Sequence, residues 1–224
     1  MYTDCWLSPN CNKCDCESNF CLKRFKCDGI FELSLLPDSA KKDIPLRVDA
    51  DGRDLENFKY LKNVQKNIDK FVESGENLYI HSPISGNGKT SWAIKLLKSY
   101  IQKIWHKSDI ECRVLFIHVP RFLLALKDNI SVKSDYVQFI KDNVANADLV
   151  VFDEIGIKAV TAFEHEHFLN IINTRLDANK SNIYTSNLSN SEVMEKLGPR
   201  LYSRIVNNSI NIEIYGSDKR GVFK

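Results

Sequence analysis

The feature that most constrains this chain is a glycine-rich stretch at residues 83–90, which reads P-I-S-G-N-G-K-T. A loop that binds phosphates needs small residues so that backbone N–H groups can surround the oxygens. It also needs a lysine for the outer phosphates and a hydroxyl group for Mg²⁺. The residues that supply these groups or lie among them are Ser85, Gly86, Asn87, Gly88, Lys89, Thr90 and Ser91. The stretch therefore predicts a site for ATP with Mg²⁺.

One position departs from the full pattern G-x-x-x-x-G-K-[ST], which has glycine where this chain has Pro83. Proline offers no N–H and fixes φ, so the turn that leaves the preceding strand must differ. We expect the backbone at Pro83 to bend away from the phosphates while residues 86–90 hold them.

The segments on either side of the loop support a phosphate site. Residues 77–82 form a short apolar run suited to a buried strand, and residues 88–107 have the periodicity of a helix. One face of that helix is apolar, and the opposite face carries Lys95, Lys98, Lys103 and Lys107. Strand, loop and helix together place the phosphates at a helix N-terminus, where the backbone N–H groups favour anions.

Length and composition limit the classes of protein to consider. A chain of 224 residues can bury one substantial core and carry one small appended module. The net charge of +2 gives no overall nucleic-acid signature, so a basic surface has to be local, as in residues 197–224, which are either a solvated tail or a binding segment. No apolar run approaches the roughly 20 residues that span a bilayer. The first residues do not resemble a signal peptide, so we expect a cytoplasmic protein without membrane contacts.

Six of the seven cysteines lie within the first 27 residues. In a reducing compartment, such crowding indicates metal binding, because clustered thiolates bind Zn²⁺ and fold a segment too short to build its own core. The predicted ligands are Cys11, Cys14, Cys16 and Cys21, with Cys5 and Cys27 as alternates. The second C-x-x-C of a strong zinc signature is absent, and an iron–sulfur cluster or free thiols are the alternatives. A short helix over residues 22–26 would carry Cys27 away from the others.

Prolines and the Asp51-Gly52 turn mark residues 29–54 as loop-like. We therefore divide the chain into a Cys-rich module at residues 1–30, a linker at 31–54 and a nucleotide-binding domain at 55–224. The last of these begins with a predicted helix over residues 57–74, whose apolar positions recur every three or four residues.

A second strand is predicted at residues 113–118 and a third at 149–152. The interval between them is predicted to hold two helices, at residues 120–127 and 134–144, although a minimal crossover needs only one. One helix is therefore an insertion. It mixes cations with aromatic residues, which can track a single nucleic-acid strand, whereas the alternative is that the aromatics are core and the lysines are solvated.

The third strand closes on two carboxylates, in the sequence L-V-V-F-D-E at residues 149–154. A buried parallel strand is continuously apolar, and ligands of α/β sheets bind at the carboxyl ends of the strands. We expect Asp153 to support the Mg²⁺ held by Thr90. We expect Glu154 to orient and polarise the attacking water.

The remaining segments alternate between helices and strands. Residues 163–178 form a predicted helix, on which His165 and His167 point to different faces and so do not suggest a metal site. A strand at residues 181–185 delivers Asn187 to the same sheet edge, either to contact the γ-phosphate or as an ordinary turn residue. A helix opened by Pro199 then puts Arg200 and Arg204 on one face. A last strand is predicted at residues 209–215, with little room for a lid domain after it.

These motifs, in this order, closely resemble the AAA+ ATPases of the DnaC/DnaI helicase-loader type, particularly versions carried by bacteriophages. The segments that carry the resemblance are G-N-G-K-T, the inserted helical region, L-V-V-F-D-E, Y-T-S-N-L and G-P-R-L-Y-S-R-I. The fold class implied is α/β, a P-loop AAA+ core with a parallel sheet between helices, no full C-terminal lid and a small Cys-rich N-terminal module.

The resemblance also implies roles for single residues. Lys89 and Thr90 would bind nucleotide and Mg²⁺, and Asp153 and Glu154 would be the Walker B pair. Asn187 would be the first sensor. Arg204 looks like an arginine finger that acts on ATP held by a neighbouring subunit, which would make hydrolysis depend on self-assembly. Arg200 could share this role, and Arg220 could stand in for the second sensor.

The function implied is an ATP-dependent loader that places the hexameric replicative helicase on single-stranded DNA. It would be a slow ATPase, stimulated by DNA or by the helicase, and would bind the helicase through its N-terminal region, where this family often has a metal-binding cysteine module. The alternatives are an IstB-type transposase-helper ATPase and a nucleotide-gated helicase adaptor or inhibitor that hardly hydrolyses ATP. The intact Glu154 argues against the last.

Overall fold

Five parallel strands form the centre of the molecule, in the order β2-β3-β4-β1-β5. The structure is a computed structural model, and it describes residues 5–7, 11, 20–43, 45–46, 52–107 and 109–218. The strands are β1 (Asn77–His81), β2 (Val114–His118), β3 (Leu149–Asp153), β4 (Ser181–Ser186) and β5 (Ile210–Glu213). Three of them, β1, β3 and β4, are buried along their whole length. Burial on both faces is what a parallel sheet covered by helices on both sides requires.

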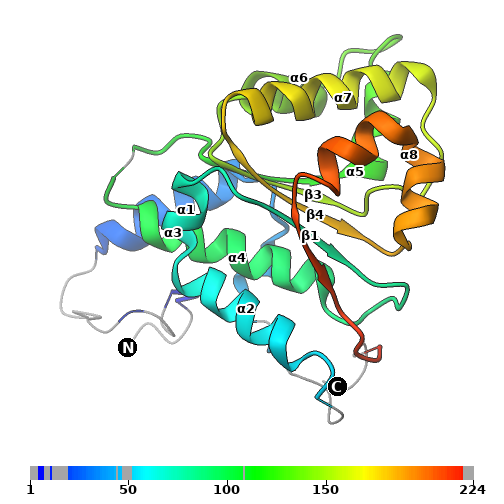
Figure 1. Ribbon diagram of the computed structural model, residues 1–224. Coiled ribbons are helices and arrows are strands. Elements are labelled where there is room, and N and C mark those ends of the chain that lie inside the picture. The colour runs from blue at the N-terminus through cyan, green and yellow to red at the C-terminus, as the bar shows by residue number, and fades with distance from the viewer. Residues whose placement is uncertain are drawn as a thin grey trace.

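Helices cover the two faces of the sheet in two layers (Figure 1). One layer consists of α1 (Leu22–Leu33), α2 (Leu55–Lys66), α3 (Ile68–Glu73) and α4 (Lys89–Ile104). The other consists of α5 (Val119–Asp128), α6 (Asp135–Asn143), α7 (Ala162–Asp177) and α8 (Asn190–Ile205). Neighbouring residues of one strand serve different layers, since Tyr79 packs with the second layer and Ile80 with the first. This alternation is what the strand geometry requires.

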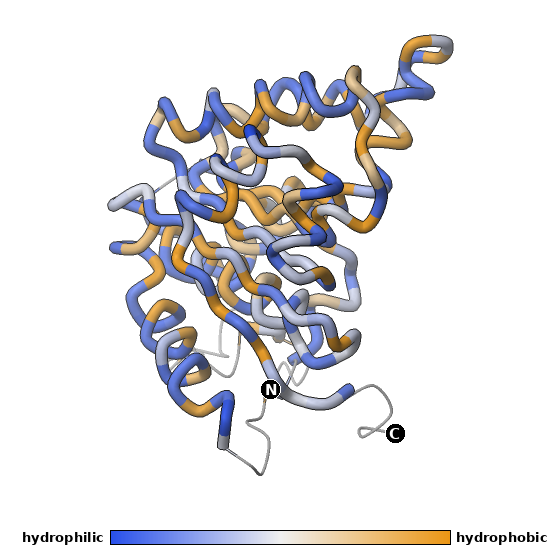
Figure 2. The backbone as a smooth tube through the Cα atoms, turned by 45° about the vertical axis from the view of Figure 1, so that its right-hand side comes forward, coloured by the Kyte–Doolittle hydropathy of each residue, from blue (hydrophilic) through white to orange (hydrophobic). Residues whose placement is uncertain are grey.

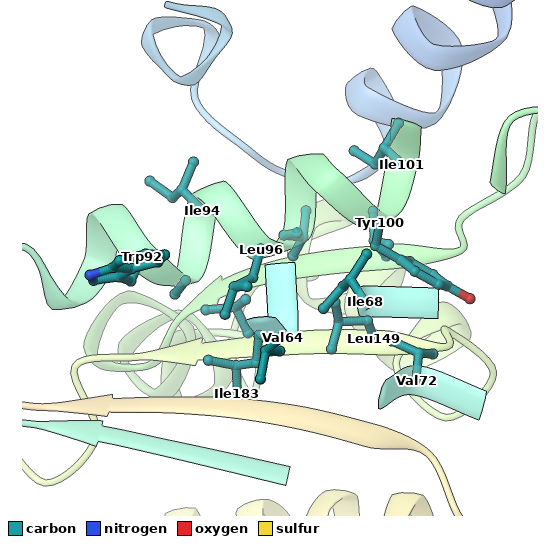
Figure 3. Packing of buried hydrophobic residues seen from close by; sticks show 14 of the residues in the cluster. Val64, Ile68, Val72, Trp92, Ile94, Leu96, Tyr100, Ile101, Leu149 and Ile183 are labelled. Atoms are coloured by element: carbon teal, nitrogen blue, oxygen red, sulfur yellow. The ribbon is translucent and has the colours of Figure 1, made fainter. Parts of the chain in front are cut away.

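The first helical layer is built around α4. Figure 3 shows Trp92, Leu96 and Tyr100 of this helix on the side that faces the sheet, whereas Ile94 and Ile101 project from its other side. Both α1 and α2 pack along α4. In Figure 2, apolar stretches run through the middle of the molecule and hydrophilic residues alternate with them along the outer helices. Among the described ranges, no helix is long and apolar enough to cross a membrane.

Two sequence-based expectations about helices need correction. The helix expected over residues 57–74 is divided at Asn67 into α2 and α3. The short helix expected over residues 22–26 continues to Leu33, because Ile30 and Phe31 are buried in the core against α4. The predicted module boundary at residue 30 therefore falls within α1.

Cys27 is the clearest consequence of that longer helix. Its side chain is 0% exposed, lies in the core and has its thiol 3.9 Å from the carbonyl oxygen of Ile101. Burial raises the pKa of this thiol to about 12. Its position in the core argues against a shared site with exposed cysteines, and the role of Cys27 as an alternate metal ligand stays a prediction.

Candidate nucleotide-binding site

The loop at residues 83–90 connects β1 to α4 at the carboxyl edge of the sheet. Pro83 and Ser85 are exposed on its outer part. Gly88 precedes the first residue of α4 and has φ of 107°. L-residues with a side chain rarely adopt such a conformation, and glycine therefore allows the loop to enter the helix directly. This arrangement is strand, phosphate loop and helix N-terminus, as the sequence predicted.

Lys89 lies inside the loop, with only 5% of its surface exposed. Its ammonium group donates hydrogen bonds to the carbonyl oxygen of Ile84, at 2.6 Å, and to Oδ1 of Asn87, at 3.0 Å. Asn87 in turn donates to Ser82 Oγ, at 2.7 Å, and to the carbonyl oxygen of Ile214. The loop is thus closed around the lysine. A bound phosphate would replace the Ile84 carbonyl and Asn87 Oδ1 as the acceptors of the Lys89 ammonium group.

Asp153, at the end of β3, connects β4 to the end of the phosphate loop. Its Oδ1 accepts hydrogen bonds from Thr90 Oγ1, at 2.8 Å, and from Thr185 Oγ1, at 2.7 Å. The side chain is 3% exposed. This burial raises the pKa of Asp153, and the two hydroxyl groups offset the effect only in part. A buried carboxylate beside a threonine hydroxyl fits Mg²⁺, which takes one or two protein oxygen ligands together with phosphates and water.

Glu154 follows Asp153 and is held by Thr185 and His118, neither of which was predicted as a site residue. Its backbone N–H donates to Thr185 Oγ1, at 3.0 Å, and its Oε2 lies 2.9 Å from Nε2 of His118. His118 Nδ1 accepts from the backbone N–H of Arg121, at 3.3 Å. This contact leaves Nε2 as the protonated nitrogen, which donates to the Glu154 carboxylate. The signal available in the sequence was position alone, since His118 and Thr185 each lie at the carboxyl end of a strand.

Asn187 lies one residue beyond β4 and is half-buried. No hydrogen bond joins its side chain to the part of the chain that the structure describes. The β4 residue that contacts the Asp153–Glu154 pair is instead Thr185. The sensor role of Asn187 stays a prediction.

Arg200 and Arg204 lie in the second half of α8, which is divided by a kink at Gly198. The second half begins at Pro199, as expected from its sequence. Both arginines are exposed, and neither makes an ion pair or hydrogen bond with another described residue. Their guanidinium groups are therefore available to a second chain. Arg220 lies outside the described residues.

The predicted zinc ligands are only partly within view, since Cys14 and Cys16 lie outside the described residues. Cys21 is exposed, and its sulfur caps α1 by accepting from the N–H of Arg24 at 3.4 Å. Over the described ranges, no group of three or more His, Cys, Asp or Glu side chains could hold a metal ion. A zinc site involving Cys5, Cys11, Cys14, Cys16 or Cys21 stays a prediction.

The aromatic side chains of the two helices between β2 and β3 are largely packed into the protein. Phe122 is fully buried, and Tyr136 and Phe139 pack against the core of the second layer. Arg121 lies over the ring of Tyr136, at 4.8 Å from its centroid. The aromatic residues of this region therefore serve the fold, and they do not form an open platform for bases.

Comparison with known proteins identifies the class. Residues 46–220 match the family described as "IstB-like ATP binding protein", and the chain belongs to this family of ATP-binding proteins. Among curated proteins, the replicative helicase loader DnaC of Escherichia coli strain K12 is 25% identical over 146 residues. The match covers 65% of this chain and 54% of DnaC, so the chain spans about half the length of the curated relatives it matches.

Solved structures show the same fold. A crystal structure of the DnaC helicase loader aligns with a TM-score of 0.58 and 22% identity, covering 83% of this chain and 98% of that one. A crystal structure of DnaI aligns with a TM-score of 0.61 and 19% identity, covering 81% and 95%. At these identities the likeness establishes the fold, which is the α/β P-loop AAA+ core expected from the sequence.

Proposed function

We propose that this protein is an ATPase that loads the replicative helicase on single-stranded DNA. The observation that carries the proposal is the connection from Thr90 through Asp153 and Thr185 to Glu154, because it joins a phosphate loop to a residue suited to activating water. Membership of the IstB-like family supports ATP binding, and the similarity to DnaC supports the proposed role as a helicase loader.

Nucleotide binding would begin with Lys89. Its ammonium group leaves the Ile84 carbonyl and Asn87 for the β- and γ-phosphates, where a positive charge is worth more than it is against neutral acceptors. Thr90 and Asp153 would hold Mg²⁺, which supplies charge neutralisation on the phosphates. Glu154 then orients the attacking water, and His118 holds its carboxylate in place until ATP is bound.

Hydrolysis would require a second subunit, because Arg204 is exposed on α8 and has no partner within the described residues. An arginine supplied by a neighbouring chain typically contributes about 10³–10⁵-fold in turnover. Mixing Glu154→Gln with Arg204→Ala tests this role. Each variant alone should be inactive, and the mixture should recover activity where an intact arginine faces an intact site. A mixture no more active than its components would contradict it.

The helicase partner is tested by mixing the protein with the host's hexameric replicative helicase on a sizing column. We expect a complex that forms with ATP and is lost in Lys89→Ala. We place the helicase contact on the Cys-rich N-terminal residues 1–30, joined through residues 31–54 to the ATPase domain at 55–224. Elemental analysis of the same sample should give about one zinc per chain. No complex at any nucleotide state would exclude the loader function.

A second candidate follows from the family name itself, since IstB-like proteins give the family its description. A transposase-helper ATPase would capture a transposase and not the helicase, so parallel pull-downs separate the two. The third alternative, an adaptor that binds ATP but hardly hydrolyses it, is tested by turnover with helicase and single-stranded DNA present. We expect slow turnover that both components stimulate.

A further inference from the structure

A cavity lies away from the phosphate loop and is lined by residues of α1, α2 and α4. These three helices belong to the first helical layer, in which α1 and α2 pack along α4 (Figure 1). The cavity has a volume of about 680 Å³, which is within the range of small-ligand sites. Five separate segments of the chain form its walls. The charged residues that line it are Lys23, Asp43, Lys62, Lys66, Lys95, Lys98 and Lys103.

Six lysines against a single aspartate is a strong local excess in a chain whose net charge is only +2. Lys95 lies 3.6 Å from that aspartate, Asp43, and Lys103 pairs with Asp69 outside the cavity at 3.8 Å. Over the described ranges, Lys23, Lys62 and Lys66 have no carboxylate partner. Within the described residues, the cavity therefore holds positive charge that carboxylates do not neutralise.

The wall around Lys98 is fixed in place by contacts between distant segments. Its ammonium group donates to the carbonyl oxygens of Ala40 and Lys42, and it lies 5.5 Å from the ring centroid of Trp6. The indole N–H of Trp6 donates to Asp28 at 2.7 Å. Burial lowers the pKa of Lys98 and of Lys62, the nearby charge of Lys95 lowers both further, and Asp43 offsets these effects only in part. The cations are thus held together at a cost that an anion would relieve.

We propose that this cavity binds a compact anion that carries several phosphate groups. Lysines act as point charges toward phosphate, and the hydroxyl and amide groups of Ser99 and Gln65 lie between them on α4 and α2. Among the described residues that line the cavity, Trp6 is the one aromatic residue, and its ring already contacts Lys98 and Phe31. The described lining therefore favours recognition of phosphates over stacking of nucleobases.

The site would connect the two ends of the first helical layer. Lys23 comes from α1, Lys62 and Lys66 come from α2, and Lys95 comes from α4. A bound polyphosphate would bridge the helix that follows the cysteine-rich segment to the helix that begins at the phosphate loop. The compact anion and a nucleic-acid backbone share phosphate chemistry, and the experiment separates these sources.

Inorganic tripolyphosphate is a suitable probe, titrated by calorimetry into Lys89→Ala so that the phosphate loop does not contribute. A parallel titration into the unmodified chain saturated with Mg-ADP covers the case in which that variant is unstable. We expect binding in both, together with a rise in melting temperature, because the ligand binds the folded state. Absence of tripolyphosphate binding in both would overturn the proposal.

The location is tested with Lys62→Gln/Lys66→Gln, which we expect to bind at least about tenfold more weakly, since two of the cavity's charges are removed. The matched control is Lys59→Gln/Lys70→Gln, which changes net charge equally at exposed positions outside the cavity. Equal affinity in the two pairs would overturn the proposal. A twenty-residue oligothymidylate serves as the nucleic-acid probe. The proposal would also be overturned if oligothymidylate binding depended on Lys62 and Lys66 while tripolyphosphate binding did not.

Discussion

At the scale of single residues, the site divides into side chains that motifs predict and side chains that only strand order can reveal. Lys89, Thr90 and Asp153 could be predicted because phosphate and Mg²⁺ binding need those groups at that spacing. His118 and Thr185 could not, because nothing in their local sequence is unusual. Their importance arises from β2 and β4 lying on either side of β3, which brings both side chains to the Asp153–Glu154 pair.

The Thr185 hydroxyl provides a test at this scale. Thr185→Val removes the donor to Asp153 and the acceptor for the Glu154 N–H while keeping the shape of the side chain. We expect ATP turnover to fall about 10–100-fold, the usual effect of losing a group that orients a metal ligand. ATP affinity should change less, because Lys89 is untouched. The control is Thr174→Val at an exposed position of α7, and equal turnover in the two variants would contradict the role of Thr185.

At the scale of helices and strands, continuous apolar runs predicted the sheet well, and regular periodicity predicted α4 and α7. The errors lie where tertiary packing decided the outcome. The prolines and the Asp51-Gly52 turn made residues 29–54 look loop-like, yet Ile30 and Phe31 gain enough burial against α4 to extend α1 to Leu33. The split at Asn67 likewise lies within an unbroken apolar pattern that sequence alone does not divide.

The kink at Gly198 sets the direction of the half of α8 that carries Arg200 and Arg204. Gly198 has φ of 78° and ψ of 164°, a combination that essentially only glycine adopts, and forcing another residue into it costs about 1–3 kcal/mol. A Cβ at this position would lie 3.8 Å from His165 Nε2, so the cost is backbone strain and not a clash. We expect Gly198→Ala to lose that much unfolding free energy in urea denaturation. Ser203→Ala on the exposed side of the same helix should change it by less than about 0.5 kcal/mol.

Asp148 connects three elements at the opposite edge of the sheet. It accepts hydrogen bonds from Tyr100 of α4, Arg113 before β2 and Lys180 before β4. Burial alone would raise its pKa, but the hydrogen bonds from Lys180 and Arg113 outweigh burial and hold the pKa below its ordinary value. A carboxylate of this kind stabilises the fold above its unfolded pKa of about 3.9, and the stabilisation is lost as pH falls through the folded pKa.

Asp148→Asn should therefore destabilise the protein by about 1–2 kcal/mol at pH 7 and by much less at pH 3. Urea denaturation of both proteins at the two pH values measures the difference. Asp177→Asn, at an exposed position at the end of α7, serves as the control and should match the unmodified chain at both. A loss in Asp148→Asn that is equal at pH 7 and pH 3 would show that the carboxylate charge does not matter.

At the scale of the whole molecule, the parallel sheet gathers the phosphate loop, the carboxylate pair and Asn187 at one edge, while Arg200 and Arg204 of α8 are exposed. The sequence predicted that these motifs meet at one edge, because motif order along a P-loop chain determines which strand ends lie together. It did not predict the lysine cavity. Lys95, Lys98 and Lys103 share one face of α4, and the sequence does not indicate that residues of α1 and α2 lie opposite that face and form a cavity with it.

The measurement that tests the central claim most directly is a titration of Mg-ATP into the purified protein, into Lys89→Ala and into Lys70→Ala as the matched control. Lys89 is buried within the loop and Lys70 is exposed on α3. We expect one ATP bound per chain, with affinity unchanged in Lys70→Ala. In Lys89→Ala, the loss of a charge-assisted contact worth about 3 kcal/mol should reduce it about a hundredfold. An unmodified chain that does not bind ATP, or a Lys89→Ala variant that binds it equally well, would contradict the account.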